Sequence, residues 1–489
     1  MYEEAIKYLN KIIELSDDEE EIENAQLEMA KCLTKIGNIS KSEEILMNLW
    51  KEKKNISALI DYIEILNYFK GEYGKSIEII EKEVEIEKLP EEDKARIFLS
   101  LGESYYFLRD LEKSKEYHLK SLNLSSYNPI LKATILNNLG VISSYGKEPE
   151  KAIYYYKEAL KENEKYDNKE KIFANLLNIA IVYNRIGEYE KGIEYLKKAL
   201  SIANVLKNKL FIGFSYKQIG YYFLIKGKYP QALGYYKKAI EIFNIFQKKP
   251  EIATVYRLMI SIYLKQCLFE EAEKILNEYL KIAEELSSPY EISNAYFYKS
   301  TIHIIKGDFE RAKELNEKSF KIAEEKNFMD VKIMCLINFG NIYLILSPEK
   351  SYEYYKKSLE LLEEINIPIL KARAFLELSK LYFIFNEKDK SIEYLEKTKE
   401  IQNFLKAEVF EGEILILKSL LENKKDYLIK GIKIAEETKN YRLLLRCLYF
   451  LSLQDKAFEY KFKSLLNHFL QNLKEINIEN FLRVLEFIE

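Results

Sequence analysis

Proline, cysteine and glycine are scarce in this sequence, with 8, 4 and 16 residues out of 489. Because proline breaks helices, its scarcity leaves few helices interrupted. The cysteines are scattered, without the paired spacing of a disulfide framework or a zinc site, at Cys32, Cys267, Cys335 and Cys447. This pattern favours reduced, buried thiols in a cytoplasm. We therefore expect a cytoplasmic protein with no metal and no other cofactor.

A charge imbalance and a long apolar run are also missing. The formal net charge is -3, whereas proteins that bind nucleic acid generally present a basic surface. No apolar run approaches the roughly 18 residues of a membrane span, and the acidic, helical start of the chain does not resemble a signal peptide. The sequence thus predicts neither a nucleic-acid partner nor a membrane partner.

Catalytic signals are equally rare. The three histidines, His118, His303 and His468, lie far apart in the sequence, and we expect the first two at packing positions. The glycines lie mostly at expected turns, and the sequence contains no glycine-rich motif of a phosphate-binding loop. A serine nucleophile elbow, a zinc helix motif and a kinase signature are all missing. We therefore expect the protein not to be an enzyme.

What the chain does contain is a repeat. The stretch Leu177–Tyr183 is followed by a Gly-Glu-Tyr turn and then by Ala199, and the same phrase returns every 40 positions. The following copy shows it at Gly220, Phe223, Gly227, Ala232 and Ala239, and the preceding copy at Gly140, Ala152, Tyr156 and Ala159. A fixed period of about 34 to 42 residues with two helical halves is typical of a helical repeat array. Hydrophobic residues at 48% and charged residues at 31% also suit an all-helical protein.

The repeat resembles the tetratricopeptide repeat family, in the bacterial type with copies of about 40 residues. The family's small, aromatic and glycine positions fall in one copy on Ala180, Tyr183, Gly187, Gly192 and Ala199. Small residues allow the two helices of a pair to approach closely, and the aromatic fills the gap beside them. The resemblance implies an all-α fold, a right-handed α-α superhelix, in which each repeat contacts its neighbours.

The copies can be followed along the chain by their turns, which we expect at Gly37, Gly71, Arg109, Lys147, Gly187, Gly227, Cys267, Gly307, Ser347 and Asn386. Near Ser347 one copy is shortened by a residue. We predict a half repeat over 1–22, an array of about ten repeats over 23–405, and a degenerate repeat with further C-terminal helices over 406–489.

The two ends of the chain differ from the array. The first helix lacks its usual partner, and its apolar stripe of Ile6, Leu9, Ile12 and Ile13 either packs on the first full repeat or abuts another domain or subunit. The last helix, over 478–488, is too apolar for a polar cap, with Phe481, Leu482, Val484, Leu485, Phe487 and Ile488. It folds back on the array or docks elsewhere, and folding back is favoured because large exposed apolar patches are uncommon. A homo-oligomer through either end is a further possibility.

Function is expected on the concave surface, which the first helix of each pair lines. Alignment of the copies places amides at one equivalent position, Asn138, Asn178, Gln218 and Asn338, with Asn341 one turn further on. A column of amides can bind an extended peptide backbone without reading its sequence, as in some members of the family. Packing and local hydrogen bonding are the alternative role for these amides.

Aromatic and cationic residues accompany the amides. Among the groove aromatics are Tyr106, Phe107, Tyr145, Tyr221 and Phe297, and the cations are Arg185, Lys217 and Arg257. Aromatic side chains anchor interfaces, and the cations suit an acidic or carboxylate group. The Lys-Asn-Arg set that chaperone-binding members use is not matched, since Lys217 is not followed by the needed Asn. The tyrosines of the second helices, such as Tyr154–Tyr156, are expected to pack.

These observations favour a non-catalytic scaffold that binds a peptide or a partner protein in the groove of the solenoid. An alternative is the sensing or regulatory arm of a larger signalling protein, because long arrays of this type resemble the C-terminal arms of bacterial ATPase-linked transcription regulators and cyclases. A peptide-responsive regulator that also binds DNA is less favoured, since neither end shows a helix-turn-helix.

Overall fold

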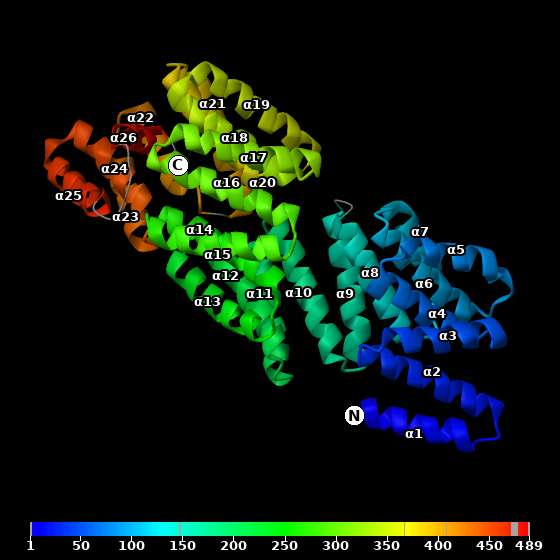
Figure 1. The fold of residues 1–489 in the computed structure, drawn as a ribbon. Helices are drawn as coiled ribbons and strands as arrows, with labels where there is room; N and C mark the ends of the chain where they lie inside the picture. The colour runs from blue at the N-terminus through cyan, green and yellow to red at the C-terminus, as the bar shows by residue number, and fades with distance from the viewer. Residues whose placement is uncertain (1, 146–147, 366, 407, 471–477, 488–489) are drawn as a thin grey trace. The chain divides into compact units, whose positions relative to one another are not determined.

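The computed structural model describes residues 2–145, 148–365, 367–406, 408–470 and 478–487, and the elements in these ranges are all helices (Figure 1). The chain divides into two compact units, Met1–Val182 and Tyr183–Glu489, and the boundary falls within helix α10. The predicted turn at Lys147 and the predicted end of the last helix at Ile488 lie outside the described residues.

The first unit is built from antiparallel helix pairs. Its elements are α1 (Tyr2–Leu15), α2 (Glu19–Lys35), α3 (Ile39–Lys53), α4 (Ile56–Ile65), the π-helix η1 (Leu66–Lys70), α5 (Tyr73–Glu83), the 3-10 helix η2 (Ile86–Lys88), α6 (Glu91–Phe107), α7 (Leu111–Leu124), α8 (Pro129–Tyr145), α9 (Pro149–Lys165) and α10 (Lys169–Arg185).

The second unit continues the pairs and ends in shorter helices. Its elements are α11 (Tyr189–Val205), α12 (Lys209–Ile225), α13 (Tyr229–Ile245), α14 (Lys249–Lys265), α15 (Phe269–Glu285), α16 (Pro289–Lys306), α17 (Phe309–Glu325), α18 (Met329–Leu346), α19 (Pro348–Glu364), α20 (Pro368–Ile384), α21 (Lys388–Leu405), α22 (Glu411–Glu422), α23 (Asp426–Thr438), α24 (Tyr441–Gln454), the 3-10 helix η3 (Lys456–Phe458), α25 (Glu459–Leu470) and α26 (Ile478–Phe487).

The helices follow a strict spacing. From α8 at Pro129 to α18 at Met329, successive helices begin 20 residues apart, which makes a pair of 40 residues. A left-handed backbone conformation recurs at the predicted turns: φ is positive at Gly37, Gly71, Arg109, Gly187, Gly227, Cys267, Gly307 and Asn386. At Ser347 φ is -161° instead, and α19 begins 19 residues after α18, so the predicted shortening is confirmed.

Small residues bring the helices of a pair together, as the repeat pattern predicts. Ala232 and Ala239 of α13 are each fully buried, and α13 packs against α12. At Gly340 in α18 the two helices approach closely, because an added Cβ atom would lie 2.2 Å from Cε1 of Tyr355 in α19. The aromatic ring thus occupies the space that the missing side chain leaves.

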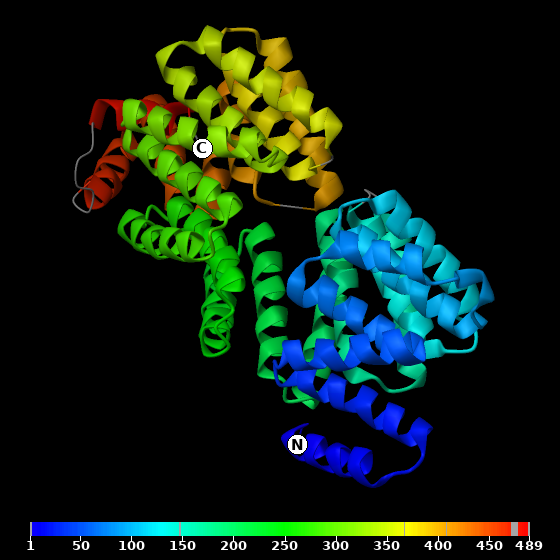
Figure 2. The ribbon, with the colours of Figure 1, turned by 45° about the vertical axis from the view of Figure 1, so that its right-hand side comes forward.

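The C-terminal helices fold back on the second unit, which confirms the favoured prediction. Helix α24 packs against α14, and α26 packs against α16, α18 and α24. Figures 1 and 2 show the orange and red helices beside the green helices of the same unit. Phe481, Val484 and Leu485 are buried by this packing, so the apolar face of α26 lies against the array helices α16 and α18.

Helix α18 shows why one sequence expectation was too simple. Met329–Leu346 is long and apolar enough to cross a membrane by length and composition, although no such run was expected. Within the unit, 67% of these residues are buried, because α16, α17, α19, α20 and α26 all pack against the helix. A helix that is apolar on all sides is buried in this way inside a large core.

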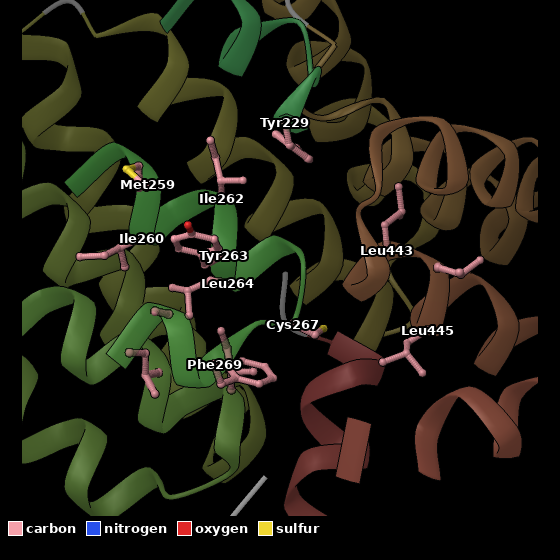
Figure 3. Packing of buried hydrophobic residues seen from close by; sticks show 14 of the residues in the cluster. Tyr229, Met259, Ile260, Ile262, Tyr263, Leu264, Cys267, Phe269, Leu443 and Leu445 are labelled. Atoms are coloured by element: carbon pink, nitrogen blue, oxygen red, sulfur yellow. The ribbon is translucent and has the colours of Figure 1, made fainter. Parts of the chain in front are cut away.

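The largest core of the second unit joins the array to the returning helices. Figure 3 shows Tyr263, Leu264 and Cys267 of the α14–α15 pair together with Leu443 and Leu445 of α24. Cys267 is buried at the turn, and burial raises the pKa of its thiol to about 12. The thiol is therefore protonated at neutral pH and behaves as a small core residue.

At the other end of the chain, α1 packs against α2. Ile6, Leu9, Ile12 and Ile13 of its apolar stripe are each half-buried. This packing corresponds to the first of the two alternatives that the sequence left open.

Candidate functional site

A cavity of about 220 Å³ lies inside the second unit, between array helices and the returning C-terminal helices. Its walls come from α14, α16, α18 and α20 on the array side and from α22 and α24 on the C-terminal side. Most of its surface is apolar, formed by Leu264, Phe297, Met334, Ile337, Leu370 and Leu443. The cavity brings together two of the predicted groove residues, Phe297 and Asn338.

Polar groups are concentrated in the same cavity. They include the amides Asn338 and Asn440, the cations Lys265, Arg373 and Arg442, and the carboxylate of Glu413. Asn338 is only 5% exposed and donates from Nδ2 to Oγ1 of Thr301 at 3.0 Å. The hydrogen bond to Thr301 of α16 thus fixes the orientation of the Asn338 amide.

A buried ion-pair network positions the C-terminal wall of the cavity. Lys380 lies 3.3 Å from the carboxylate of Glu377 and 3.5 Å from that of Glu413. Arg446 contacts the same Glu413 carboxylate and also donates from Nε to the backbone oxygen of Leu485 at 2.7 Å. These contacts join α20, α22, α24 and α26. Separating the helices would leave a buried charge without its partner, which is costly, so the network holds them against one another.

A second cavity, of about 460 Å³, adjoins the first and shares Glu413, Asn440 and Leu443 with it. Its lining is more polar and comes from the turn after α12 and from α21, α22 and α23, with Lys226, Gln402, Asn403, Lys406, Glu408 and Glu437. Lys226 donates from Nζ to the backbone oxygen of Lys406 at 3.1 Å, and this hydrogen bond joins the turn after α12 to the end of α21.

The other predicted residues of the second unit lie outside these cavities. Asn341 is buried, and its Oδ1 accepts a hydrogen bond from the hydroxyl of Tyr355 at 2.6 Å, so it serves helix packing. Lys217 pairs with Glu251 of the next inner helix. Gln218 and Tyr221 are half-buried on α12, and Tyr221 packs against the main core.

Two predicted cations differ in their surroundings. Arg257 is half-buried on α14, with Tyr298 as an electrostatic partner. Arg185 is exposed at the end of α10. Neither lines the cavities described above.

Asn138, a predicted residue of the first unit, belongs to a separate polar cluster. Asn138 donates from Nδ2 to Oε1 of Glu103 at 3.1 Å, and the same nitrogen lies 3.3 Å from Nε2 of His118. Nδ1 of His118 lies 2.7 Å from the backbone oxygen of Ser114, so Nδ1 carries the proton and Nε2 accepts from Asn138. These residues line a cavity of about 250 Å³ together with Tyr68, Tyr106 and Phe107.

Burial shifts the proton affinity of both titratable groups in this cluster. Burial, together with the charge of Glu64, raises the pKa of the Glu103 carboxyl to about 7. Burial lowers the pKa of His118 to about 4. At neutral pH the imidazole is therefore neutral, as its hydrogen bonds require.

The remaining predicted residues of this unit are Asn178 and Tyr145. Asn178 donates to Oδ1 of Asn137 at 3.4 Å, and Asn175 donates to the same oxygen at 3.2 Å, so neighbouring amides join α8 to α10. Tyr145 is 59% exposed, and its ring lies 6.2 Å from that of Tyr106.

Residues 172–245 match the sequence model of the tetratricopeptide repeat, and the helix pairs around them repeat the same spacing and small-residue contacts. The chain therefore contains tetratricopeptide repeats. No curated protein sequence matches it.

Solved tetratricopeptide-type structures share the fold at low sequence identity. The apo form of the quorum sensor NprR from B. thuringiensis is 16% identical with a TM-score of 0.58, covering 71% of this chain and all of NprR. A Rap protein complexed with competence and sporulation factor is 17% identical with a TM-score of 0.54, covering 70% of this chain and 98% of the Rap protein.

A third solved structure is a signal transduction ATPase with numerous domains and a tetratricopeptide repeat sensor, from Pyrococcus horikoshii. It is 20% identical with a TM-score of 0.51, covering 68% of this chain and 54% of the ATPase. At these identities the likeness shows the fold.

Sequence reasoning missed most polar residues of the main cavity and of the ion-pair network beside it. Glu377 and Lys380 stand 39 residues after Asn338 and Asn341, so the repeat alignment reaches them only when the shortened turn at Ser347 is taken into account. Arg373 lies one turn before Glu377. Glu413 and Arg442 belong to the degenerate C-terminal helices, where the pattern is too weak to assign an inward-facing position.

Proposed function

We propose that this protein is a cytoplasmic, non-catalytic scaffold that binds a peptide segment inside its second unit. The observation that carries the proposal is the half-enclosed cavity in which Phe297 and Asn338 lie among apolar and cationic side chains. An aromatic anchor beside amide and guanidinium donors suits a peptide, since it combines apolar burial with groups that bind the backbone.

The similar structures support the same proposal. One of them is a Rap protein in complex with competence and sporulation factor, and another is a quorum sensor. Both are related to this chain by their fold, and a peptide ligand is consistent with the size and chemistry of the cavity.

Affinity selection from a pool of random synthetic hexapeptides tests this function. We expect the wild-type protein to retain a subset of sequences, and a Phe297→Ala, Asn338→Ala double variant to lose that retention. Phe246→Ala is the matched control, because Phe246 is 41% exposed at the end of α13 and does not line the cavity. Equal retention by the wild type and the double variant would place binding elsewhere, and no retention at all would refute peptide binding.

A second candidate is the sensing arm of a larger signalling protein, favoured by the fold likeness to the tetratricopeptide sensor of the Pyrococcus ATPase. An immunoblot of the native cell distinguishes the two: a band near 58.0 kDa supports the stand-alone scaffold, and a much larger band supports the arm.

A further inference from the structure

We infer that the cavity of the first unit, which is lined by three aromatic rings and the carboxylate of Glu103, binds a quaternary ammonium group. The rings are those of Tyr68, Tyr106 and Phe107. The site lies in a different unit from the proposed peptide cavity, so its ligand is independent of the proposed function.

The three rings form adjoining walls of the cavity. The ring of Phe107 lies 5.2 Å from that of Tyr68 at an interplanar angle of 89°, and 5.6 Å from that of Tyr106 at 67°. Phe107 also stacks on Tyr73 at 5.0 Å, which fixes the orientation of its ring. Because the face of an aromatic ring is electron-rich, rings that meet at steep angles are suited to surround a methylated ammonium group.

The position of Tyr68 depends on the π-helix η1, a rare geometry that often occurs at functional sites. Asn67 of η1 is buried and donates from Nδ2 to Oγ of Ser104 in α6 at 2.9 Å. Its Oδ1 accepts a hydrogen bond from Oγ of Ser76 at 2.9 Å. These bonds hold η1 against α6, while the side chain of Tyr68 remains 56% exposed to solvent.

A carboxylate completes the cavity. Glu103 accepts a hydrogen bond from Nδ2 of Asn138 at 3.1 Å, and the hydroxyl of Tyr68 is a second donor to it. Within the described part of the chain Glu103 forms no ion pair. The charge of Glu64 in α4 adds to the negative potential at this carboxyl. These groups favour a positively charged ligand.

The positive charges of the protein nearby do not fill the cavity. Lys171 acts on Glu103 and Arg109 acts on Tyr106 through their charges, but both side chains are exposed and neither lines the cavity. Elsewhere in the same unit, Lys113 lies over the ring of Tyr105 at 4.9 Å. Among the described residues no lysine or arginine lies over the three rings of the cavity in this way.

The chemistry of the lining selects the kind of cation. A Ca²⁺ ion takes about six to eight oxygen ligands, whereas this cavity offers one carboxylate beside the rings, Val141 and Ile142. A primary ammonium group has three N–H donors that need acceptors, and Glu103 already accepts from Asn138 and Tyr68. A quaternary ammonium group has no N–H donor to satisfy, so the ring faces and the carboxylate suffice to bind it.

The size of the cavity also suits such a group. It measures about 250 Å³, below the roughly 300 to 1,000 Å³ of pockets for drug-sized ligands. A small head group therefore fits.

Isothermal titration calorimetry at pH 8 compares choline with dimethylbutanol, in which carbon replaces the charged nitrogen. We expect choline to bind the wild-type protein about tenfold more tightly. Glu103→Gln removes the charge and Tyr68→Leu removes one wall, so each should weaken choline binding about tenfold. Tyr166→Leu is the matched control and should bind as the wild type does, because Tyr166 is also 56% exposed in the first unit and does not line the cavity.

The pH dependence of binding separates an electrostatic role of Glu103 from a structural one. Its pKa is raised to about 7, chiefly by burial, so the carboxyl ionises between pH 6 and pH 8 and choline affinity should rise over this range. Choline keeps its charge throughout. The other groups that act on this carboxyl or adjoin it, Glu64, Tyr68, His118 and Lys171, are retained in Glu103→Gln. This variant should therefore show a flatter pH profile than the wild type.

A hexapeptide with a central trimethyllysine identifies the source of the ammonium group. Binding tighter than that of choline would assign the site to a methylated lysine of a partner protein, and weaker binding to a free small ammonium compound. Circular dichroism checks the folding of each variant. Equal affinity for choline and dimethylbutanol, or choline binding unchanged in both Glu103→Gln and Tyr68→Leu, would overturn the inference. Failure of the wild type to bind either choline or the trimethyllysine peptide would overturn it as well.

Discussion

Asn480 of the last helix donates from Nδ2 to the backbone oxygen of Gly307 at 2.9 Å, across 173 positions of the sequence. The contact depends on a missing side chain, because an added Cβ atom at Gly307 would lie 2.5 Å from Cβ of Asn480. Gly307 also has a φ of +77°, which glycine adopts at little cost. The same residue thus ends α16 and receives α26, which joins the last helix to the array helices of the second unit.

The buried ion pairs behind the cavity should be costly to break. Arg446→Met keeps an apolar stem but leaves Glu413 with a weaker set of cationic contacts, so we expect a loss of about 3 to 5 kcal/mol in the stability of the second unit. Lys463→Met is the control, because the Lys463–Glu459 pair is exposed and worth less than about 1 kcal/mol. Hydrogen exchange of α24 and α26 measures the effect, and unchanged exchange in Arg446→Met would contradict the account.

Close packing within a repeat predicts that replacing glycine by alanine lowers the stability at one position and raises it at another. Gly340→Ala forces a Cβ atom against the ring of Tyr355, and we expect it to destabilise the second unit by about 1 to 3 kcal/mol. Gly234→Ala in α13 meets no atom within 4 Å and should stabilise its helix by about 0.5 to 1 kcal/mol. Urea unfolding followed by circular dichroism compares them, and equal effects at both sites would disprove the packing argument.

The raised pKa of Glu103 makes the first unit sensitive to pH. The pKa is about 7 in the folded protein and 4.5 as the ordinary value, so the protonated carboxyl stabilises the fold fully below pH 4.5. This stabilisation is lost as the pH rises through 7. Glu103→Gln, which stays neutral, should leave the stability unchanged near pH 4.5 and raise it by about 1 to 3 kcal/mol at pH 8.

Trp50 provides the measurement, because it is the single tryptophan of the chain and is buried in the first unit. Its fluorescence during urea unfolding should give a wild-type midpoint that falls between pH 5 and pH 8 relative to that of Glu103→Gln. Parallel midpoints of the two proteins across this range would rule out the shift.

The positive φ values at non-glycine turns predict gains in stability. Arg109 has a φ of +66° and Lys439 a φ of +56°, a conformation that costs an L residue about 1 to 2 kcal/mol. Arg109→Gly and Lys439→Gly should each stabilise the respective unit by roughly 0.5 to 1 kcal/mol, after the added entropy of the unfolded glycine is subtracted. A lower unfolding midpoint in both variants would refute this.

The repeat architecture could be predicted because each copy has the same requirements, namely small residues at helix contacts and a positive φ at the turn. Ala232, Ala239 and Gly340 lie where two helices touch, and Gly187 and Gly227 lie where the backbone has a positive φ. These local rules predicted the turns, including the shortened one at Ser347. They also predicted the return of α26, since its apolar residues required a partner.

The candidate site was harder to predict because it depends on contacts between distant segments. Phe297 and Asn338 belong to the regular array and could be placed on its inner helices. Arg442 and Glu413 come from helices in which the repeat pattern is weak, and no local feature of the sequence indicates that they line the same cavity as Arg373. The predicted amides also have different partners within the protein. Asn138 contacts Glu103 and His118, while Asn341 accepts a hydrogen bond from Tyr355.

The central claim is that a peptide binds inside the second unit. Hydrogen exchange of the full chain, with and without the tightest hexapeptide selected from the random pool, tests it most directly. The account predicts protection in α16, α18, α20 and α22, with residues 2–145 unchanged. Protection confined to residues 91–145, around Glu103, His118 and Asn138, would contradict the account and move the binding site to the first unit.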